Sequence, residues 1–373
     1  MKTKTLLIFL LTVGCISSAI GQVNDSNVAA PLELATSIPL PNVTGRIGHL
    51  CYNSKQQQIY VAALGNNTLE VLDFQNKKKI SSIKSFEQPQ GVEFMPSSDI
   101  IIVTSIGTNF CKTFNSNTFK LIGSINLGPK GNTVKYSPLK QLVYIGYDGA
   151  IAVCDANSFD VKATIKLPGL PESFLVNEES GKMYVNVPKT SQIIVVDLNK
   201  FEIKNTWQVE GASDNCSMAF DKANHRLFIG CRNPAKLLVI DSETGKKIAS
   251  VDIDGDTNDV FYNSTTKQIY VSCGDGYLNI IKQAFKEVKQ EVKQETKPAA
   301  KKSKGKKGAK PVKKEAPKQE AKTVNQDVYE TSSRIFTSKG ARTCLYVPEL
   351  NQLVVAAPAA SGKDAQLMVY QIK

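Results

Sequence analysis

Short apolar runs of one form recur along the chain. Each copy consists of an apolar run, a small or polar turn and a second apolar run, as in "KQQQIYVAALGNNTLEVLD" from Lys55 and "TTKQIYVSCGDGYLNII" from Thr265. Further copies begin at Leu139, Glu179 and Ala223. The runs alternate apolar and polar residues or are wholly apolar and β-branched, which is typical of strands in packed sheets. The pattern therefore predicts an all-β protein built from repeats.

One position in the first run of each copy gives the period. Two weaker copies carry Ile102 and Val354 there, and five copies carry an aromatic residue. The aromatic residues are Tyr60, Tyr144, Tyr184, Phe228 and Tyr270. Successive spacings are 42, 42, 40, 44, 42 and 84 residues, so roughly one repeat length is inserted before the last copy. We expect these marker side chains to pack between neighbouring repeats.

Two more runs complete each repeat. One of them precedes the marker by eight positions, at Tyr52, Phe94, Tyr136, Val176, Phe220, Tyr262 and Tyr346. The other follows the second run, as in "KKISSIKSF" and "KATIKLPG". Seven units of four strands predict a seven-bladed β-propeller with four antiparallel strands per blade, formed by residues 32–373 as a single domain. The last unit lacks its fourth strand, and we expect "LELATSIPLP" at residues 32–41 to supply it and close the ring.

The repeats resemble those of the YVTN-repeat β-propeller family, in which an apolar run with Tyr-Val-Thr-Asn leads through a Gly/Asn turn to a Val-Ile-Asp strand. The stretch "IYVAALGNNTLEVLD" carries the resemblance, whereas "YIGY", "YVNV", "FIGC" and "YVSC" depart from the core motif. A WD-repeat propeller is not indicated, because its Gly-His and Trp-Asp pairs are missing and Trp207 is the only tryptophan. The resemblance implies an exported scaffold and no particular chemistry.

The N-terminus has the layout of a signal peptide over residues 1–21. Positively charged "MKTK" precedes apolar "LLIFLLTV", and "AIG" places small residues before Gln22. The alternative is a lipoprotein anchored through Cys15, although Thr12 stands where such sites usually carry leucine. No later stretch reaches the roughly 18 apolar residues of a membrane span. We therefore expect an exported monomer, periplasmic or extracellular.

The net charge of +12 is concentrated in the inserted segment. Residues 284–327 hold 14 lysines and six acidic residues, so that with Lys2 and Lys4 they account for +10 and leave the rest nearly neutral. We expect a lysine-rich disordered insert in blade six, beginning with a short helical stub that carries Phe285, Val288 and Val292. Two interpretations stay open: a solvated loop, or a tether to an anionic polymer or surface such as extracellular DNA, acidic polysaccharide or anionic lipid.

A repeated column of aspartates is assigned a structural role. Each ends the second apolar run of its repeat, at Asp73, Asp155, Asp197 and Asp241. Because the residue recurs in four of the seven blades, we expect it to cap a turn by accepting hydrogen bonds from nearby backbone amides.

The candidate binding residues lie in a column that does not repeat. Loops that lead into the first strand of each blade gather at one end of the central channel. Their polar residues are Arg46, His49, Gln90, Asn132, Glu172, Asp214, Asn215, Asp256, Asn258, Asp259 and Arg342. The chain is accordingly predicted to be a binding scaffold whose funnel of mixed charge suits a small polar or anionic ligand, or a protein. The alternative is that these residues only complete the turns and hydrate the channel.

A second functional alternative is enzymatic. Asn132, Glu172, Asn215 and Asp259 offer the oxygen ligands that Ca²⁺ or Mg²⁺ prefers, and gluconolactonase-like propellers hold a divalent cation with similar residue types. Under this hypothesis the ion would polarise a lactone carbonyl and activate water. The scaffold interpretation requires no cofactor.

The cysteines offer one geometric hypothesis. Apart from Cys15, seven cysteines remain, with no CxxC pair and no cysteine–histidine cluster. Cys51 and Cys344 fall on innermost strands of neighbouring blades, so a disulfide between them is possible if the two side chains face each other. Free buried thiols are the default expectation.

Overall fold

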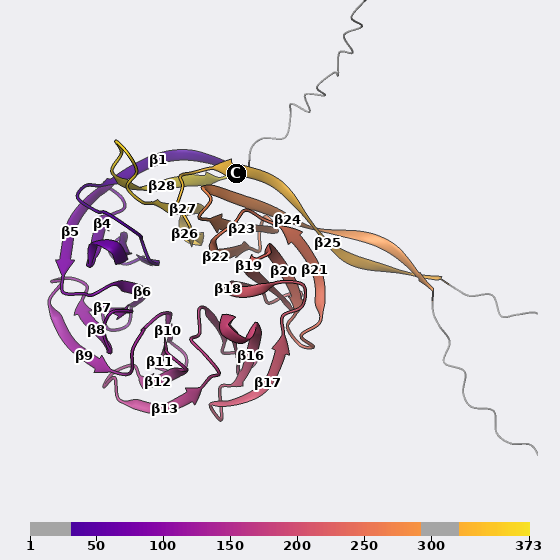
Figure 1. The fold of residues 1–373 in the computed structure, drawn as a ribbon, viewed down its shortest axis with the longest axis horizontal. Coiled ribbons are helices and arrows are strands. Elements are labelled where there is room, and N and C mark those ends of the chain that lie inside the picture. Colours follow the sequence, from indigo (N-terminus) through magenta and orange to yellow (C-terminus); the bar gives the residue numbers. More distant parts are fainter. Residues whose placement is uncertain (1–30, 292–320) are drawn as a thin grey trace, which may run out of the picture.

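Seven four-stranded antiparallel sheets surround a central axis in the computed structural model, which describes residues 31–291 and 321–373 (Figure 1). Each sheet is one blade, with its first strand innermost. The predicted seven-bladed propeller is therefore confirmed. The predicted signal peptide, Cys15 and the lysine run at residues 298–317 lie outside the described residues.

The strands follow one another in chain order in blades one to six, whereas in blade seven β1 lies beside β28 as the fourth strand. They are β2 (Leu50–Asn53), β3 (Gln58–Ala63), β4 (Thr68–Asp73) and β5 (Lys78–Lys84) in blade one; β6 (Pro89–Met95), β7 (Ile100–Ser105), β8 (Phe110–Asn115) and β9 (Leu121–Asn126) in blade two; β10 (Val134–Ser137), β11 (Leu142–Tyr147), β12 (Ala150–Asp155) and β13 (Val161–Lys166) in blade three; β14 (Phe174–Asn177), β15 (Lys182–Val187), β16 (Gln192–Asp197) and β17 (Glu202–Gln208) in blade four; β18 (Ser213–Asp221), β19 (Arg226–Asn233), β20 (Ala235–Asp241) and β21 (Lys247–Asp252) in blade five; β22 (Thr257–Asn263), β23 (Gln268–Cys273), β24 (Tyr277–Glu291) and β25 (Ala321–Phe336) in blade six; and β26 (Thr343–Val347), β27 (Gln352–Ala357), β28 (Ala365–Ile372) and β1 (Leu32–Leu40) in blade seven.

Within residues 31–291 and 321–373, the helical elements are limited to short 3-10 turns. They are η1 (Leu64–Asn66), η2 (Pro188–Thr190) and η3 (Pro348–Leu350). Within the described ranges, none of the helices has the length and apolar character needed to cross a bilayer.

The N-terminal strand closes the ring as predicted. β1 runs antiparallel to β28, with Leu32 opposite Ile372 and Leu40 opposite Ala365. The outermost strand of blade seven thus comes from the start of the domain (Figure 1). This pairing joins the two ends of the domain within one sheet and covers an edge of β28 that would otherwise be exposed.

The two predicted columns of large residues meet between neighbouring blades. All five aromatic markers are fully buried. The ring centroid of Phe228 lies 5.1 Å from that of Tyr262, which is on the innermost strand of the next blade. The ring centroid of Tyr184 likewise lies 5.8 Å from that of Phe220, on the innermost strand of the blade after its own. Such offset aromatic contacts contribute both buried area and favourable ring geometry. The packing role predicted for the markers is confirmed.

The aspartate column caps turns as predicted. Oδ1 of Asp155 accepts hydrogen bonds from the backbone N–H groups of Asn157 and Ser158 at 2.8 and 3.1 Å. Asp73, Asp197 and Asp241 accept equivalent bonds, and Asn115 takes the same position in blade two. The pKa of each of the four carboxyl groups is lowered, that of Asp155 to about 2 because Lys162 donates to it and the turn amides add to that effect.

Replacing Asp155 by asparagine is expected to give a pH-dependent loss of stability. A depressed pKa in the folded state stabilises the fold above the unfolded value of about 3.9, and this contribution is lost as the pH falls through about 2. Thermal unfolding should show a lower midpoint for Asp155→Asn at pH 7, with a gap that narrows between about pH 4 and pH 2. Asp160→Asn, at an exposed site in the same turn, is the control. A gap that stayed constant down to pH 2 would contradict this role.

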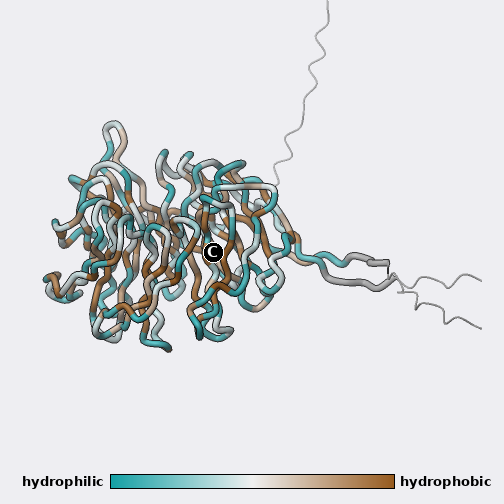
Figure 2. Tube along the Cα trace, turned by 60° about the horizontal axis from the view of Figure 1, so that its bottom comes forward, coloured by the Kyte–Doolittle hydropathy of each residue, from teal (hydrophilic) through white to brown (hydrophobic). Residues whose placement is uncertain are grey.

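The inserted segment begins as a β-ribbon. β24 and β25 continue beyond the blade as an antiparallel pair, with Ala284 opposite Val328 and Glu291 opposite Ala321. The ribbon projects past the rim of the disc (Figures 1 and 2). The helical stub predicted from residue 284 is wrong as far as residue 291, because each of these residues pairs with a strand residue that lies 30 or more positions away in the sequence.

The disulfide hypothesis is also wrong. All seven cysteines in the described ranges are free. Cys51 packs with the apolar cluster between blades one and two, whereas Cys344 packs with the cluster between blades six and seven, so their side chains turn apart. Burial raises the pKa of both thiols, which disfavours the reactive thiolate.

Candidate functional site

The loops leading into the innermost strands, the start of β18 and the end of β19 bring six charged residues together at one end of the central channel. We call this group the channel mouth; its members are Arg46, Glu172, Asp214, Arg232, Asp256 and Arg342. They come from blades one, four, five, six and seven. Five of the six were predicted from the sequence, and Arg232 was not.

Arg342 is held at the mouth by a bidentate ion pair. Its Nη1 and Nη2 atoms lie 2.8 and 2.6 Å from the two carboxylate oxygens of Asp256 on the neighbouring blade. The Nε–H group of Arg342 is buried and has no hydrogen-bond partner in the described part of the chain. A fork-to-fork pair of this kind fixes the guanidinium plane, so the orientation of Arg342 is set before any ligand arrives.

Arg232 enters the mouth from the end of β19. Its Nε atom donates to the backbone carbonyl of Thr257 and its Nη2 atom to Oδ1 of Asn258, both at 2.9 Å. Oδ1 of Asp214 lies 3.7 Å from Nη1 of Arg232, and Oδ1 of Asp256 lies 3.8 Å from its Nε, so both carboxylates interact with the charge of this arginine. Asn258, a predicted site residue, is thereby confined to orienting an arginine.

Arg46 differs from the other two arginines. Its side chain is exposed at the mouth, and among the described residues no carboxylate lies within the 4.0 Å that defines an ion pair. Loss of hydration among the surrounding loops and then the positive charge of Arg342 lower the pKa of Arg46; Glu172 acts in the opposite direction, and Arg232 adds to the repulsion. The guanidinium of Arg46 therefore experiences repulsion from two arginines as well as attraction from Glu172 and Asp256.

His49 and Asp259 form a second pair just inside the mouth. His49 Nδ1 lies 3.2 Å from Oδ1 of Asp259, and the other carboxylate oxygen accepts the backbone N–H of Cys344 at 3.0 Å. Both side chains are mostly buried, with 24% and 13% of their surface exposed. The pair links blades one, six and seven across the top of the channel.

The remaining predicted residues have mainly structural contacts. Asn132 donates to Glu172 at 3.1 Å, so these two residues do meet. Asn215 is fully buried and donates to Asn186 and to the backbone carbonyl of Gln192. It therefore turns into the blade and away from the mouth. Gln90 is also buried, and its backbone carbonyl accepts the N–H of His49 at 2.9 Å.

The oxygen donors proposed for a divalent cation do not form a ligand set. Asp259 is occupied by His49 and an amide, and the Asn132 amide N–H group is turned toward Glu172. In residues 31–291 and 321–373, no group of three or more His, Cys, Asp and Glu side chains is arranged to hold a metal ion. These contacts give no support to the metal-dependent hydrolase hypothesis.

The channel below the mouth carries an ion pair that the sequence analysis missed. A cavity of about 380 Å³ is lined by all seven innermost strands. Within it Lys135 lies 3.9 Å from Glu93, whose pKa is raised by burial and only partly offset by Lys135 and the amide of Tyr136. The opposite wall is apolar at Phe261 and Leu345. The sequence did contain an indication of this pair. Glu93 and Lys135 are the two charged residues in the column nine positions before the marker, which is otherwise apolar.

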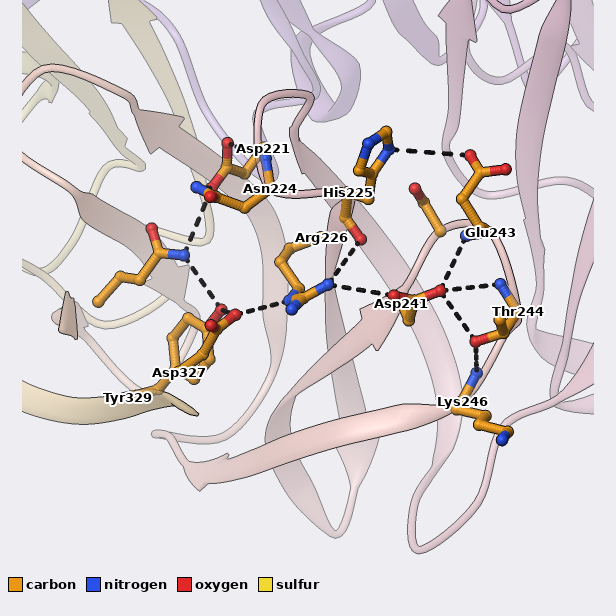
Figure 3. Close-up of polar contacts among 12 residues, drawn as sticks. Asp221, Asn224, His225, Arg226, Asp241, Glu243, Thr244, Lys246, Asp327 and Tyr329 are labelled. Atoms are coloured by element: carbon orange, nitrogen blue, oxygen red, sulfur yellow. Dashed lines mark hydrogen bonds and ion pairs between the residues drawn. The ribbon is translucent and has the colours of Figure 1, made fainter. Parts of the chain in front are cut away.

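A separate polar cluster lies at the opposite ends of blades five and six (Figure 3). Arg226 donates from Nε to Asp327 at 2.6 Å and from Nη1 to Asp241 at 3.1 Å. Asp327 also accepts the hydroxyl of Tyr329, and Gln283 joins Tyr329 to Asp221. Because Asp327 belongs to the ribbon strand β25, this cluster fastens the base of the ribbon to the neighbouring blade.

Comparisons with known proteins identify the fold of the chain and no family. No family model matches the sequence, and no curated protein matches it either. Among solved structures, hydrazine synthase of Kuenenia stuttgartiensis superposes with a TM-score of 0.66 at 11% identity, over 89% of this chain and 97% of that chain. At this identity the similarity shows the fold alone. The class is therefore a seven-bladed β-propeller.

Proposed function

We propose that this protein is an exported binding scaffold whose channel mouth recognises the carboxylate or phosphate group of a small polar ligand. The observation that carries the proposal is Arg46, an exposed residue whose guanidinium has no ion pair among the described residues. Arginine presents a planar fork that suits carboxylate and phosphate groups in two-point contact.

The surroundings of Arg46 support this assignment. Arg342 and Arg232 are held in place by Asp256, Thr257 and Asn258, so a ligand meets positions that are already ordered. An anion beside Arg46 would relieve the repulsion from Arg342 that lowers its pKa. Such preorganisation reduces the entropic cost of binding. Carboxylates of the mouth limit the overall charge and favour a small ligand with one anionic group over a polyanion.

Export and tethering are proposed on the sequence alone. The leader at residues 1–21 directs the chain out of the cytoplasm under this proposal, and the lysine-rich residues of 284–327 attach it to an anionic polymer or surface. Membership of the YVTN-repeat family and a monomeric state stay predictions of the same kind.

Replacing Arg46 by glutamine is expected to weaken anion binding at least tenfold. Isothermal titration of the full chain with lactate and with inorganic phosphate at constant ionic strength should give saturable binding of at least one of them. The tenfold loss corresponds to about 1.4 kcal/mol, the lower range for a hydrogen bond to a charged group. Arg334→Gln, at an exposed arginine on β25 outside the mouth, is the matched control. Equal binding by wild type and Arg46→Gln, or binding of neither anion, would contradict the proposal.

A further inference from the structure

A groove of about 730 Å³ lies between blades one and two, apart from the channel. Its walls come from η1, β4, β5, β8 and the loops that follow β1, β5 and β7. The turn at η1 contacts the lead-in loop of blade one, since Gly65 N–H donates to the carbonyl of Arg46 at 2.8 Å. The groove therefore opens on the same face as the channel mouth.

Most of the residues that line this groove have polar side chains. Of its 12 residues, seven are amide or hydroxyl side chains, three are lysines, one is the carboxylate of Glu87 and one is Phe86. Phe86 is 8% exposed, so it offers little ring surface for stacking. Dense amide and hydroxyl groups beside cations are the chemistry that hydrogen-bonds to sugar hydroxyls while pairing with acidic groups.

Two of the lysines are fixed in place by the protein. Lys79 lies 3.1 Å from the carboxylate of Glu70 and donates to the carbonyl of Pro41 at 2.7 Å. Glu70 is fully buried beneath the groove and also accepts the hydroxyl of Ser82 at 2.9 Å. Lys112 donates to the carbonyl of Ser85. These contacts hold cationic groups at the groove through a buried carboxylate and two main-chain carbonyls.

The third lysine remains available. Lys84 is exposed, and no carboxylate of the described residues lies within ion-pair distance of it. The charge of Glu70 balances that of Lys79. Lys84 and Lys112 together contribute +2 and Glu87 contributes −1, so the groove has a net charge of +1. A ligand with well-spaced carboxylates and many hydroxyls matches this balance better than the dense charge of a nucleic acid.

We infer that the groove between blades one and two binds an acidic oligosaccharide. The uronate carboxylates pair with Lys84 and Lys112, and the sugar hydroxyls bond to the surrounding amide and hydroxyl side chains. Little aromatic surface is exposed for base stacking, which single-stranded nucleic acids would use. The site is separate from the channel mouth and does not depend on the small-anion proposal made for Arg46.

Binding of tetragalacturonate to the full chain tests the inference. In isothermal titration at constant salt, the double variant Lys84→Glu with Lys112→Glu should bind at least tenfold more weakly than wild type. The matched control is Lys166→Glu with Lys204→Glu, two exposed lysines on the outer strands β13 and β17. It carries the same change of net charge and should bind within twofold of wild type. Maltotetraose, which lacks carboxylates, should not bind measurably.

Three results would overturn the inference: no binding of tetragalacturonate by wild type, an equal loss in both double variants, or oligothymidylate of the same charge binding as tightly with the same dependence on Lys84 and Lys112. The milder pair Lys84→Gln with Lys112→Gln should bind at least threefold more weakly. It keeps the test valid if charge reversal disturbs the fold, which circular dichroism will show. Arg46→Gln should leave tetragalacturonate binding unchanged and thereby separates this site from the mouth.

Discussion

Replacing Phe228 by alanine is expected to lower the free energy of unfolding by about 3–5 kcal/mol, the usual cost of removing a buried aromatic side chain. Phe228 is fully buried between blades five and six, with ring centroids 5.1 Å from Tyr262 and 5.9 Å from Tyr329. Its removal leaves a cavity that neighbouring strands cannot fill without breaking their ladders. The loss should exceed that of most single substitutions in this chain.

Urea unfolding followed by far-ultraviolet circular dichroism measures this effect. Phe110→Ala is the matched control, because Phe110 lies on β8 with 44% of its surface exposed. The control should lose about 1 kcal/mol or less. A similar loss in both variants would mean that the marker column does not hold the blades together.

Replacing Arg226 by methionine is expected to lower the free energy of unfolding by about 2–4 kcal/mol at pH 7. Arg226 is the shared partner of Asp327 and Asp241, and only 8% of the Asp327 side chain is exposed (Figure 3). Without the guanidinium, two carboxylates would face each other with little solvent. The base of the ribbon should loosen first, because Asp327 is the ribbon residue that Arg226 anchors.

Amide hydrogen exchange and urea unfolding together test this prediction. Exchange should accelerate in residues 284–287 and 326–330 of Arg226→Met more than in blades one to three. Lys236→Met is the control, since its partner Asp252 is 86% exposed and an exposed pair contributes about 1 kcal/mol or less. Adding Asp327→Asn to Arg226→Met should recover part of the lost stability. A double variant no more stable than Arg226→Met would contradict the ion-pair account.

The blades were predictable because propeller repeats are nearly periodic. Each blade of a propeller packs against neighbouring blades that are equivalent to it, so residues in the same column have the same structural role in every blade. Tyr184 and Phe228 were therefore recognised as packing residues and Asp155 as a turn cap. The closing strand was predicted from arithmetic: six complete units and one incomplete unit require a fourth strand from elsewhere in the chain.

The ribbon could not be read from local pattern. Phe285 and Val288 are spaced as on a helix, and Lys, Glu and Gln are good helix formers. Pairing with residues 321–327 overrides that preference, because β24 simply continues its ladder and satisfies its backbone groups across the ribbon. The partner strand lies beyond a long insertion, so nothing within a window of ordinary length indicates it.

The candidate site was only partly predictable. Arg46, Asp256 and Arg342 were found because they break a repeating column at the lead-in loops. Arg232 was missed because it lies at the end of β19, four positions after the marker Phe228, and not in a lead-in loop. Glu93 and Lys135 escaped because they line the channel from within strands. Which of these side chains touch depends on the ring geometry, which the repeat length alone does not supply.

A crystal of the full chain soaked in selenate tests the small-anion site most directly, because the anomalous signal of selenium locates the anion. The account predicts a peak at the channel mouth within hydrogen-bonding distance of the Arg46 guanidinium, with Arg342 still paired to Asp256. The same soak of Arg46→Gln crystals should lose that peak. Selenate found only at other surfaces, with Arg46 paired to Glu172 and the mouth free of anion, would contradict the central claim.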